Sequence, residues 1–196
     1  MRQRVNSSLT LVVAVLCLAP ACYGQTPRPR VGKSEAVRLV KVASLAGWKE
    51  AVSDAGRFRI LFRGEPEVAD EPTGRGFEMR GERVKWFALY HDFEVQVDDD
   101  DTTLTRKYKE SIEAVAEKRG SKLLARNSVT LNGRPGVGFI LLGPAGPGQR
   151  AKSYMRAFQV GSRLYTLAVD DYGDVTESAV VPAEVQTFFD SFTFWE

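Results

Sequence analysis

The sequence predicts an α+β fold, in which an antiparallel sheet of about six or seven strands is sandwiched between helices. Three observations support this prediction. Strand-like segments follow one another as hairpins, two segments with helical periodicity accompany them, and two of the strands are apolar on both faces. A strand that is apolar on both faces needs cover on each side, so it belongs inside a sheet with a layer on both faces.

The first clear strand is predicted around Phe58, Ile60 and Phe62, which share one face while arginines occupy the other. Gly64-Glu65-Pro66 ends this strand. The preceding segment, residues 37–48, is ambiguous. Its apolar residues have helical spacing, but the segment lacks a convincing helix cap.

Three hairpins are predicted after this strand. They comprise residues 76–80 with 83–90, 129–131 with 137–142, and 154–160 with 163–169. Parity allows the strand that begins at residue 83 to continue to Val97. The strands at 137–142 and 164–169 are the two that are apolar on both faces, so we expect them to be central.

Two helices are predicted. The first follows four consecutive aspartates and ends near Gly120, and its apolar stripe is formed by Leu104, Tyr108, Ile112 and Val115. The second begins near Pro182, a residue that suits a first helical turn, and carries Val185, Phe188, Phe189 and Phe192.

The N-terminus predicts export from the cytoplasm. Arg2 and Arg4 precede an apolar run at residues 9–19, and small residues follow where a signal peptidase could cut, after Ala21 or Gly24. The run is about half of the roughly 20 residues that span a bilayer, so the mature chain is expected to have no transmembrane span. We therefore divide the chain into a signal peptide (1–24), a linker or poorly ordered segment (25–45) and a single domain (46–196), located outside the cytoplasm.

The two cysteines, Cys17 and Cys22, lie within or beside the signal peptide. The domain thus has neither a disulfide framework nor a thiol nucleophile. Residues 18–22 loosely resemble the cleavage box of bacterial lipoproteins, which makes lipidation of Cys22 and membrane anchoring an alternative. The large aliphatic residue of that box stands one position early, at Leu18, so we favour plain secretion.

Charge composition excludes some partners. Without the signal peptide the basic and acidic side chains balance. A neutral domain has no overall field that would steer it onto nucleic acid or anionic lipid, so no nucleic-acid partner is expected.

The order of several segments resembles the PsbP-like superfamily, which includes the extrinsic photosystem subunit PsbP, the mycobacterial LpqN lipoproteins and many exported bacterial proteins of unknown function. The segments are Gly56-Arg57-Phe58-Arg59-Ile60-Leu61-Phe62-Arg63-Gly64-Glu65-Pro66, the Leu-Asn-Gly-Arg-Pro-Gly turn, Gly161-Ser162-Arg163-Leu164-Tyr165-Thr166-Leu167 and Phe188-Phe189-Asp190-Ser191-Phe192. The resemblance covers about residues 46–194, although Arg63 stands where such proteins often have proline. It implies an α/β/α sandwich and an accessory or binding role, with no catalytic residue set.

Acidic residues are the candidate ligands for a metal. Asp98, Asp99, Asp100 and Asp101 could bind calcium, but they lack the alternation of an EF-hand loop, and negative charge before a helix N-terminus is the commoner role of such a run. Asp170, Asp171 and Asp174 form a second acidic group. The single histidine, His91, falls among apolar residues of its strand and is interpreted as structural.

Three other features are weighed as surface sites. Arg57, Arg59 and Arg63 could form a stripe that contacts anions, but nearby acidic residues favour a mixed solvated surface. Trp86 and Tyr90 could mark a partner surface, although a covered core is the commoner explanation. The glycine- and proline-rich residues 143–148 are interpreted as a mobile loop rather than a phosphate-binding loop.

We therefore expect an exported, non-enzymatic accessory or binding domain that docks on another cell-envelope protein, without a cofactor. One alternative is a small-ligand or calcium-binding module that uses the acidic groups at 98–101 and 170–174. A less favoured alternative is a hydrolase built on a pair of carboxylates.

Overall fold

A computed structural model describes residues 37–40, 46–71, 74–93, 101–173 and 175–195. Seven antiparallel strands form the main sheet, in the order β4-β5-β6-β10-β9-β8-β7. Their bounds are β4 Glu67–Glu71, β5 Gly74–Arg80, β6 Val84–Asp92, β7 Lys122–Leu131, β8 Arg134–Gly146, β9 Gln149–Val160 and β10 Arg163–Asp171.

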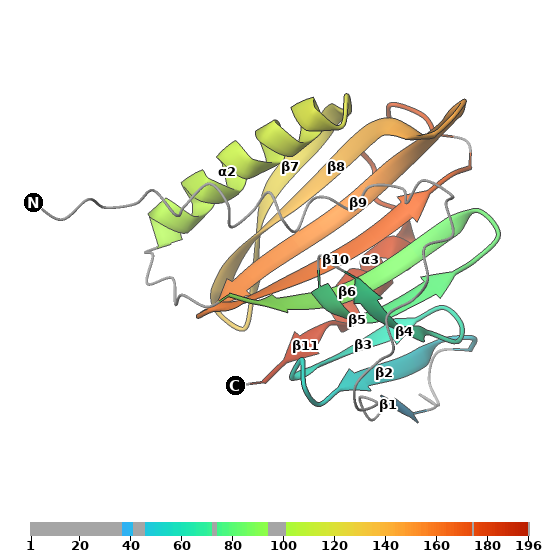
Figure 1. Ribbon diagram of the computed structural model, residues 1–196, viewed down its shortest axis with the longest axis vertical. Helices are drawn as coiled ribbons and strands as arrows, with labels where there is room; N and C mark the ends of the chain where they lie inside the picture. Colours follow the sequence, from blue (N-terminus) through green and yellow to red (C-terminus); the bar gives the residue numbers. More distant parts are fainter. Residues whose placement is uncertain (1–36, 41–45, 72–73, 94–100, 174, 196) are drawn as a thin grey trace, which may run out of the picture.

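A smaller sheet has the order β1-β2-β3-β11. Its strands are β1 Val37–Val40, β2 Lys49–Ser53, β3 Phe58–Phe62 and β11 Thr193–Phe194. The helices are α2 (Asp101–Lys118) and α3 (Ala183–Ser191). In Figure 1, α2 lies alongside β7 and β8, whereas the small sheet lies at the other side of the molecule.

Two apolar cores lie on opposite faces of the main sheet. One packs the sheet against β3, α3 and β11, and the other packs it against the buried side of α2. The central strand β10 serves both, since Tyr165 and Leu167 belong to the first core while Leu164 and Ala168 belong to the second. The α+β fold and the central place of residues 164–169 are thereby confirmed. The strand at 137–142 lies inside the sheet but only second from its edge.

The covering layer beside β3 differs from the prediction of helices alone. There α3 shares the cover with the small sheet. Part of the ambiguous segment 37–48 is a strand, because β1 pairs with β2 in antiparallel register from Val37 opposite Ser53 to Val40 opposite Glu50. Backbone hydrogen bonds to a neighbouring strand replace those of a short uncapped helix, which is marginal on its own. This strand falls within the range 25–45 that we assigned to a linker.

Turn chemistry matches the prediction at several positions. Asn132 and Gly133 have φ values of 51° and 75° and join β7 to β8, as expected for an Asn-Gly hairpin turn. Gly120 has a φ of 58° just after α2, where the Ser121 N–H donates to the Ala116 carbonyl at 2.8 Å. Helix α3 follows Pro182 as predicted.

Most of the segment 143–148 is strand rather than loop, and residues 147–148 form the turn between β8 and β9. Strand β8 continues to Gly146 and pairs with β9 as far as Gly146 opposite Gln149, with an irregularity in register after Pro144. A proline is tolerated at such an irregularity because no ladder hydrogen bond from its nitrogen is needed there. In the part of the chain described here, no helix is long and apolar enough to cross a membrane.

Candidate functional site

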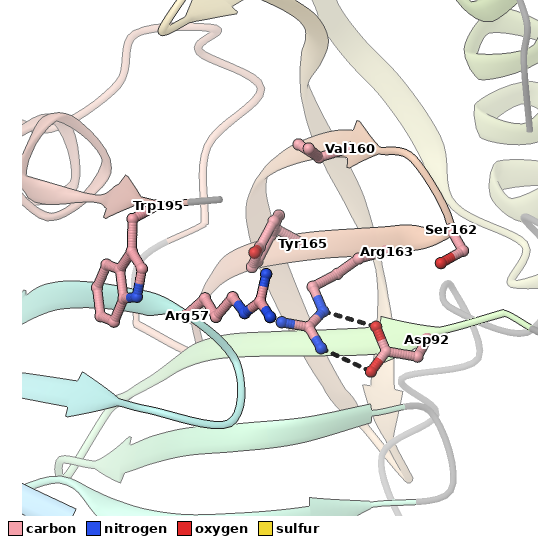
Figure 2. A pocket seen from close by; sticks show the side chains of 7 residues that line it. All are labelled: Arg57, Asp92, Val160, Ser162, Arg163, Tyr165 and Trp195. Atoms are coloured by element: carbon pink, nitrogen blue, oxygen red, sulfur yellow. Dashed lines mark hydrogen bonds and ion pairs between the residues drawn. The ribbon is translucent and has the colours of Figure 1, made fainter. Parts of the chain in front are cut away.

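A shallow pocket of about 340 Å³ lies where the main sheet meets the small sheet. We call it the Arg57 pocket. Its lining residues come from the β2–β3 turn, the end of β6, the β9–β10 hairpin and the C-terminal strand region: Arg57, Asp92, Val160, Ser162, Arg163, Tyr165 and Trp195 (Figure 2).

Arg163 and Asp92 form a bidentate ion pair across the β6–β10 ladder, where the two residues lie directly opposite each other. The Arg163 Nε and Nη2 atoms donate to the two carboxylate oxygens of Asp92 at 2.6 and 2.7 Å. The Arg163 hydrogen bond is the main reason that the pKa of Asp92 lies below its ordinary value, and the same bond raises the pKa of Arg163. The guanidinium also lies over the Tyr90 ring, 4.7 Å from its centroid. The charge of Arg163 is thus neutralised within the fold.

The β2–β3 turn is fastened to the sheet by three hydrogen bonds to consecutive carbonyls. The Arg163 Nη1 atom donates to Ala55 at 3.0 Å, the Tyr165 hydroxyl donates to Gly56 at 3.0 Å, and the Trp195 backbone N–H donates to Arg57 at 3.1 Å. Tyr165 is buried, and this burial raises the pKa of its phenol. These bonds fix the backbone of the turn before any ligand arrives.

Arg57 occupies an unusual backbone conformation at the end of this turn. Its φ is 53°, in the left-handed region that glycine and asparagine adopt more readily than other residues. Its side chain is exposed, and its guanidinium donates no hydrogen bond and forms no ion pair within the described residues. The charge of Arg57 does reach its neighbours, since it contributes to lowering the pKa of Asp92 and acts to lower that of Tyr165.

Trp195 supplies an apolar surface at the same pocket. It is 40% exposed, whereas the other two tryptophans, Trp48 and Trp86, are 9% and 3% exposed. In Figure 2 the Arg57 side chain lies between the Trp195 indole and the Arg163–Asp92 pair. The pocket therefore combines an arginine that has no ion-pair partner among the described residues with an exposed aromatic ring. It holds no histidine, cysteine or lysine among its lining residues, and its one carboxylate is held by Arg163.

Most of the metal candidates from the sequence fall outside the described residues. Asp98, Asp99 and Asp100 lie outside the described residues, as do Asp174 and Cys22, and Asp101 is the first residue of α2. No group of three or more residues suited to hold a metal occurs among the described residues. The structure therefore does not test the predicted calcium site.

Asp170 and Asp171 lie in β10 rather than in a loop. Burial raises the pKa of Asp170 above its ordinary value, and the Ser153 hydroxyl donates to this carboxylate at 2.6 Å. Asp171 accepts the backbone N–H of Gly173 at 2.8 Å. Both carboxylates thus have partners within the fold.

The other sequence candidates make contacts within the fold. His91 is half-buried and contacts the Phe93 ring, with 4.7 Å between centroids. Trp86 and Tyr90 are buried in the core that faces β3, so they form no partner surface. Arg59 bonds to Thr193 and Arg63 pairs with Glu184, and a mixed charged surface is confirmed for these two arginines.

Sequence reasoning named Arg57 as part of a stripe but missed Asp92, Arg163 and Trp195 as site residues. Arg163 and Asp92 are 71 residues apart, and only the antiparallel register places them opposite each other. An aromatic residue next to the C-terminal strand was the available signal for Trp195, since the pattern of buried phenylalanines ends at Phe194.

Comparison with known proteins finds a similar fold among solved structures but no match by sequence. No protein-family model and no curated protein sequence matches this chain. The solved structure of cyanobacterial PsbP (CyanoP) from Synechocystis sp. PCC 6803 matches with a TM-score of 0.56 and 12% identity, covering 80% of this chain and 97% of that one.

Two further structures have lower scores. The Ran-binding protein Mog1p of Saccharomyces cerevisiae has a TM-score of 0.40 at 11% identity, covering 82% of this chain and 96% of its own. The PA94 protein of Pseudomonas aeruginosa, described as a putative regulator of unknown function, has a TM-score of 0.38 at 12% identity, covering 70% and 83%. The CyanoP match alone indicates a shared architecture, and it agrees with the sandwich described above. The chain has a PsbP-like fold.

Proposed function

We propose that this chain is an exported, non-enzymatic binding domain that docks on another protein of the cell envelope, with the Arg57 pocket at the centre of the contact. The observation that supports this most directly is the pairing of an exposed tryptophan with an arginine that lacks an ion-pair partner among the described residues. Tryptophan and arginine are enriched among the residues that dominate binding energy at protein interfaces.

The state of the polar groups favours binding over catalysis. A general base needs a free acceptor, but both oxygens of Asp92 accept hydrogen bonds from Arg163. A nucleophile needs an activating base, and none stands among the residues that line the pocket with Ser162. What the pocket offers instead is an arginine side chain on a fixed backbone turn and an exposed aromatic ring.

A stable protein contact needs more area than this pocket provides. Standard interfaces bury roughly 800 Å² on each partner, so the pocket would be the anchor of a larger patch on this side of the molecule. Export is supported by the N-terminal basic and apolar segments, and an accessory role is in line with the family resemblance of the sequence. N-terminal mass spectrometry of the chain produced in its source would identify the cleavage site and show whether Cys22 carries lipid.

The docking proposal is tested by crosslinking and affinity capture from an envelope fraction of the source, with residues 25–196 as bait. We expect one reproducible, near-stoichiometric partner, which is lost when Arg57→Asn and Trp195→Ala are combined. The matched control is Val180→Ala, which alters a side chain that is 74% exposed and does not line the pocket. Capture of no partner under conditions that retain a control complex would refute the proposal, as would a partner that ignores the pocket variant.

The calcium-binding alternative stays a prediction of the sequence. It requires a rise in melting temperature on addition of calcium that Asp98→Asn with Asp100→Asn abolishes. A melting temperature that does not respond to calcium would exclude it.

A further inference from the structure

The ligand chemistry of the Arg57 pocket follows from its charges. Two guanidinium groups and one carboxylate line it. Three N–H groups of Arg163 are already committed, two to Asp92 and one to the Ala55 carbonyl. The remaining positive charge belongs to Arg57, whose guanidinium keeps all of its donors available within the described part of the chain. A single negative charge in the ligand would therefore balance the site.

We infer that the Arg57 pocket binds the carboxylate of an aspartate or glutamate in an acidic segment of the partner protein, with the neighbouring partner residue packed on the Trp195 indole. This inference rests on the docking function proposed above. A guanidinium presents paired N–H groups in a planar fork that matches the two oxygens of a carboxylate. The exposed indole beside it offers contact area for an apolar side chain of the same segment.

The geometry lowers the cost of this recognition. The turn that carries Arg57 is fixed at three consecutive carbonyls, one of them bonded to the Trp195 backbone. On this protein, binding therefore has to order the side chains of Arg57 and Trp195 but not their backbone, because the backbone positions of both contact residues are set in advance. An arginine at a φ of 53° also occupies a position where glycine or asparagine would be less strained.

Asp92 makes a carboxylate a better ligand than a phosphate. Its side chain is 51% exposed at the same pocket and keeps its negative charge, since Arg163 holds its pKa low. A doubly charged phosphate would leave excess negative charge facing Asp92, and like charges in one site repel. A singly charged carboxylate would balance Arg57 without that excess.

The test uses synthetic peptides and the intact mature chain. The probe is a hexapeptide of alternating glutamate and leucine, acetylated and amidated so that it has no terminal charges. The matched peptide carries glutamine in place of glutamate. Because Trp48 and Trp86 are buried, acrylamide quenching of tryptophan emission reports mainly on Trp195. Loss of that quenching on titration with peptide measures binding at the pocket.

We expect the glutamate peptide to bind about tenfold more tightly than the glutamine peptide, as is typical for a charge-assisted hydrogen bond. Arg57→Asn should make the two peptides equal. Arg57→Lys should keep part of the difference, since it retains the charge but not the fork. Arg106→Asn is the matched control, because it removes an exposed arginine on α2, away from the pocket lining, and should leave the tenfold difference unchanged.

Three results would overturn the inference: equal affinity for the two peptides, no binding at millimolar peptide, or stronger competition by inorganic phosphate than by acetate. Failure of the docking function is distinguishable from these. Binding of the glutamate peptide through Arg57 without capture of an envelope partner would refute the docking function while supporting the carboxylate specificity of the pocket. Capture of a partner that survives Arg57→Asn but not Trp195→Ala would support the docking function and refute the inference.

Discussion

Replacing Arg57 by asparagine should stabilise the fold while it weakens ligand binding. At a φ of 53° an ordinary side chain crowds the following carbonyl, which costs roughly 1–2 kcal/mol. Asparagine tolerates this conformation better. The substitution removes no hydrogen bond or ion pair within the described residues, although it does remove a favourable long-range attraction between Arg57 and Asp92.

The expected net gain is therefore about 0.5–1 kcal/mol in the free energy of unfolding. For a chain of this size, a change of 1 kcal/mol moves the melting temperature by roughly 2–4 °C. Urea unfolding followed by circular dichroism would give the free energy, and a thermal melt would give the temperature. An unchanged slope with urea concentration would show that the unfolded state is unaffected.

Arg57→Ala is the control, because alanine removes the guanidinium without relieving the backbone. It should be no more stable than the starting protein. The reasoning is refuted if Arg57→Asn is no more stable than Arg57→Ala, because the left-handed conformation would then carry no cost that asparagine relieves. Stabilisation together with loss of peptide binding would show that the strain is kept for recognition.

Three further substitutions test the packing and the charges. Arg163→Ala should cost about 1–2 kcal/mol in urea unfolding, because the β2–β3 turn loses an anchor and Asp92 loses its partner in a partly exposed pair. Asp170→Asn should stabilise the protein at neutral pH and not below about pH 3. Burial raises the pKa of Asp170, so wild-type stability falls as pH rises through the ordinary value near 3.8, and equal stability curves for the two proteins against pH would contradict this. Ile112→Val, at a fully buried position of α2, should cost about 0.5–1.5 kcal/mol in the same urea assay, and a neutral effect would mean that α2 packs loosely.

Alternation in the sequence was a reliable guide wherever one face of a strand is apolar. Phe58, Ile60 and Phe62 are fully buried as their spacing predicts. It failed for β4, an edge strand rich in acidic residues in which Ala69 is buried but Val68 is exposed. It also failed for β1 and β11, since strands of four and two residues are too short to show a period. These two short strands form because β2 and β3 supply backbone hydrogen-bond partners for them, which is an effect of tertiary structure.

Most residues of the candidate site could not be predicted from local sequence patterns. Asp92 and Arg163 have no motif in common, and their pairing depends on the register of β6 against β10. The acidic run at 98–101 drew attention because its residues are adjacent in sequence, whereas the Arg57 pocket draws its residues from four distant segments. Arg57 was recognised as exposed, but its left-handed conformation and the absence of an ion-pair partner among the described residues required the structure.

The pairing of β11 with β3 determines when the core beside β3 can be completed during synthesis. Arg59 and Thr193, which bond to each other in the small sheet, are 134 residues apart. The Phe58 ring is enclosed only when Phe192 has joined Phe77, Tyr90 and Tyr165 around it. A chain made from its N-terminus thus cannot complete the core beside β3 until nearly its last residues have emerged. The contacts that complete this core thus join the two ends of the described domain, and long-range contacts of this kind form more slowly than local ones.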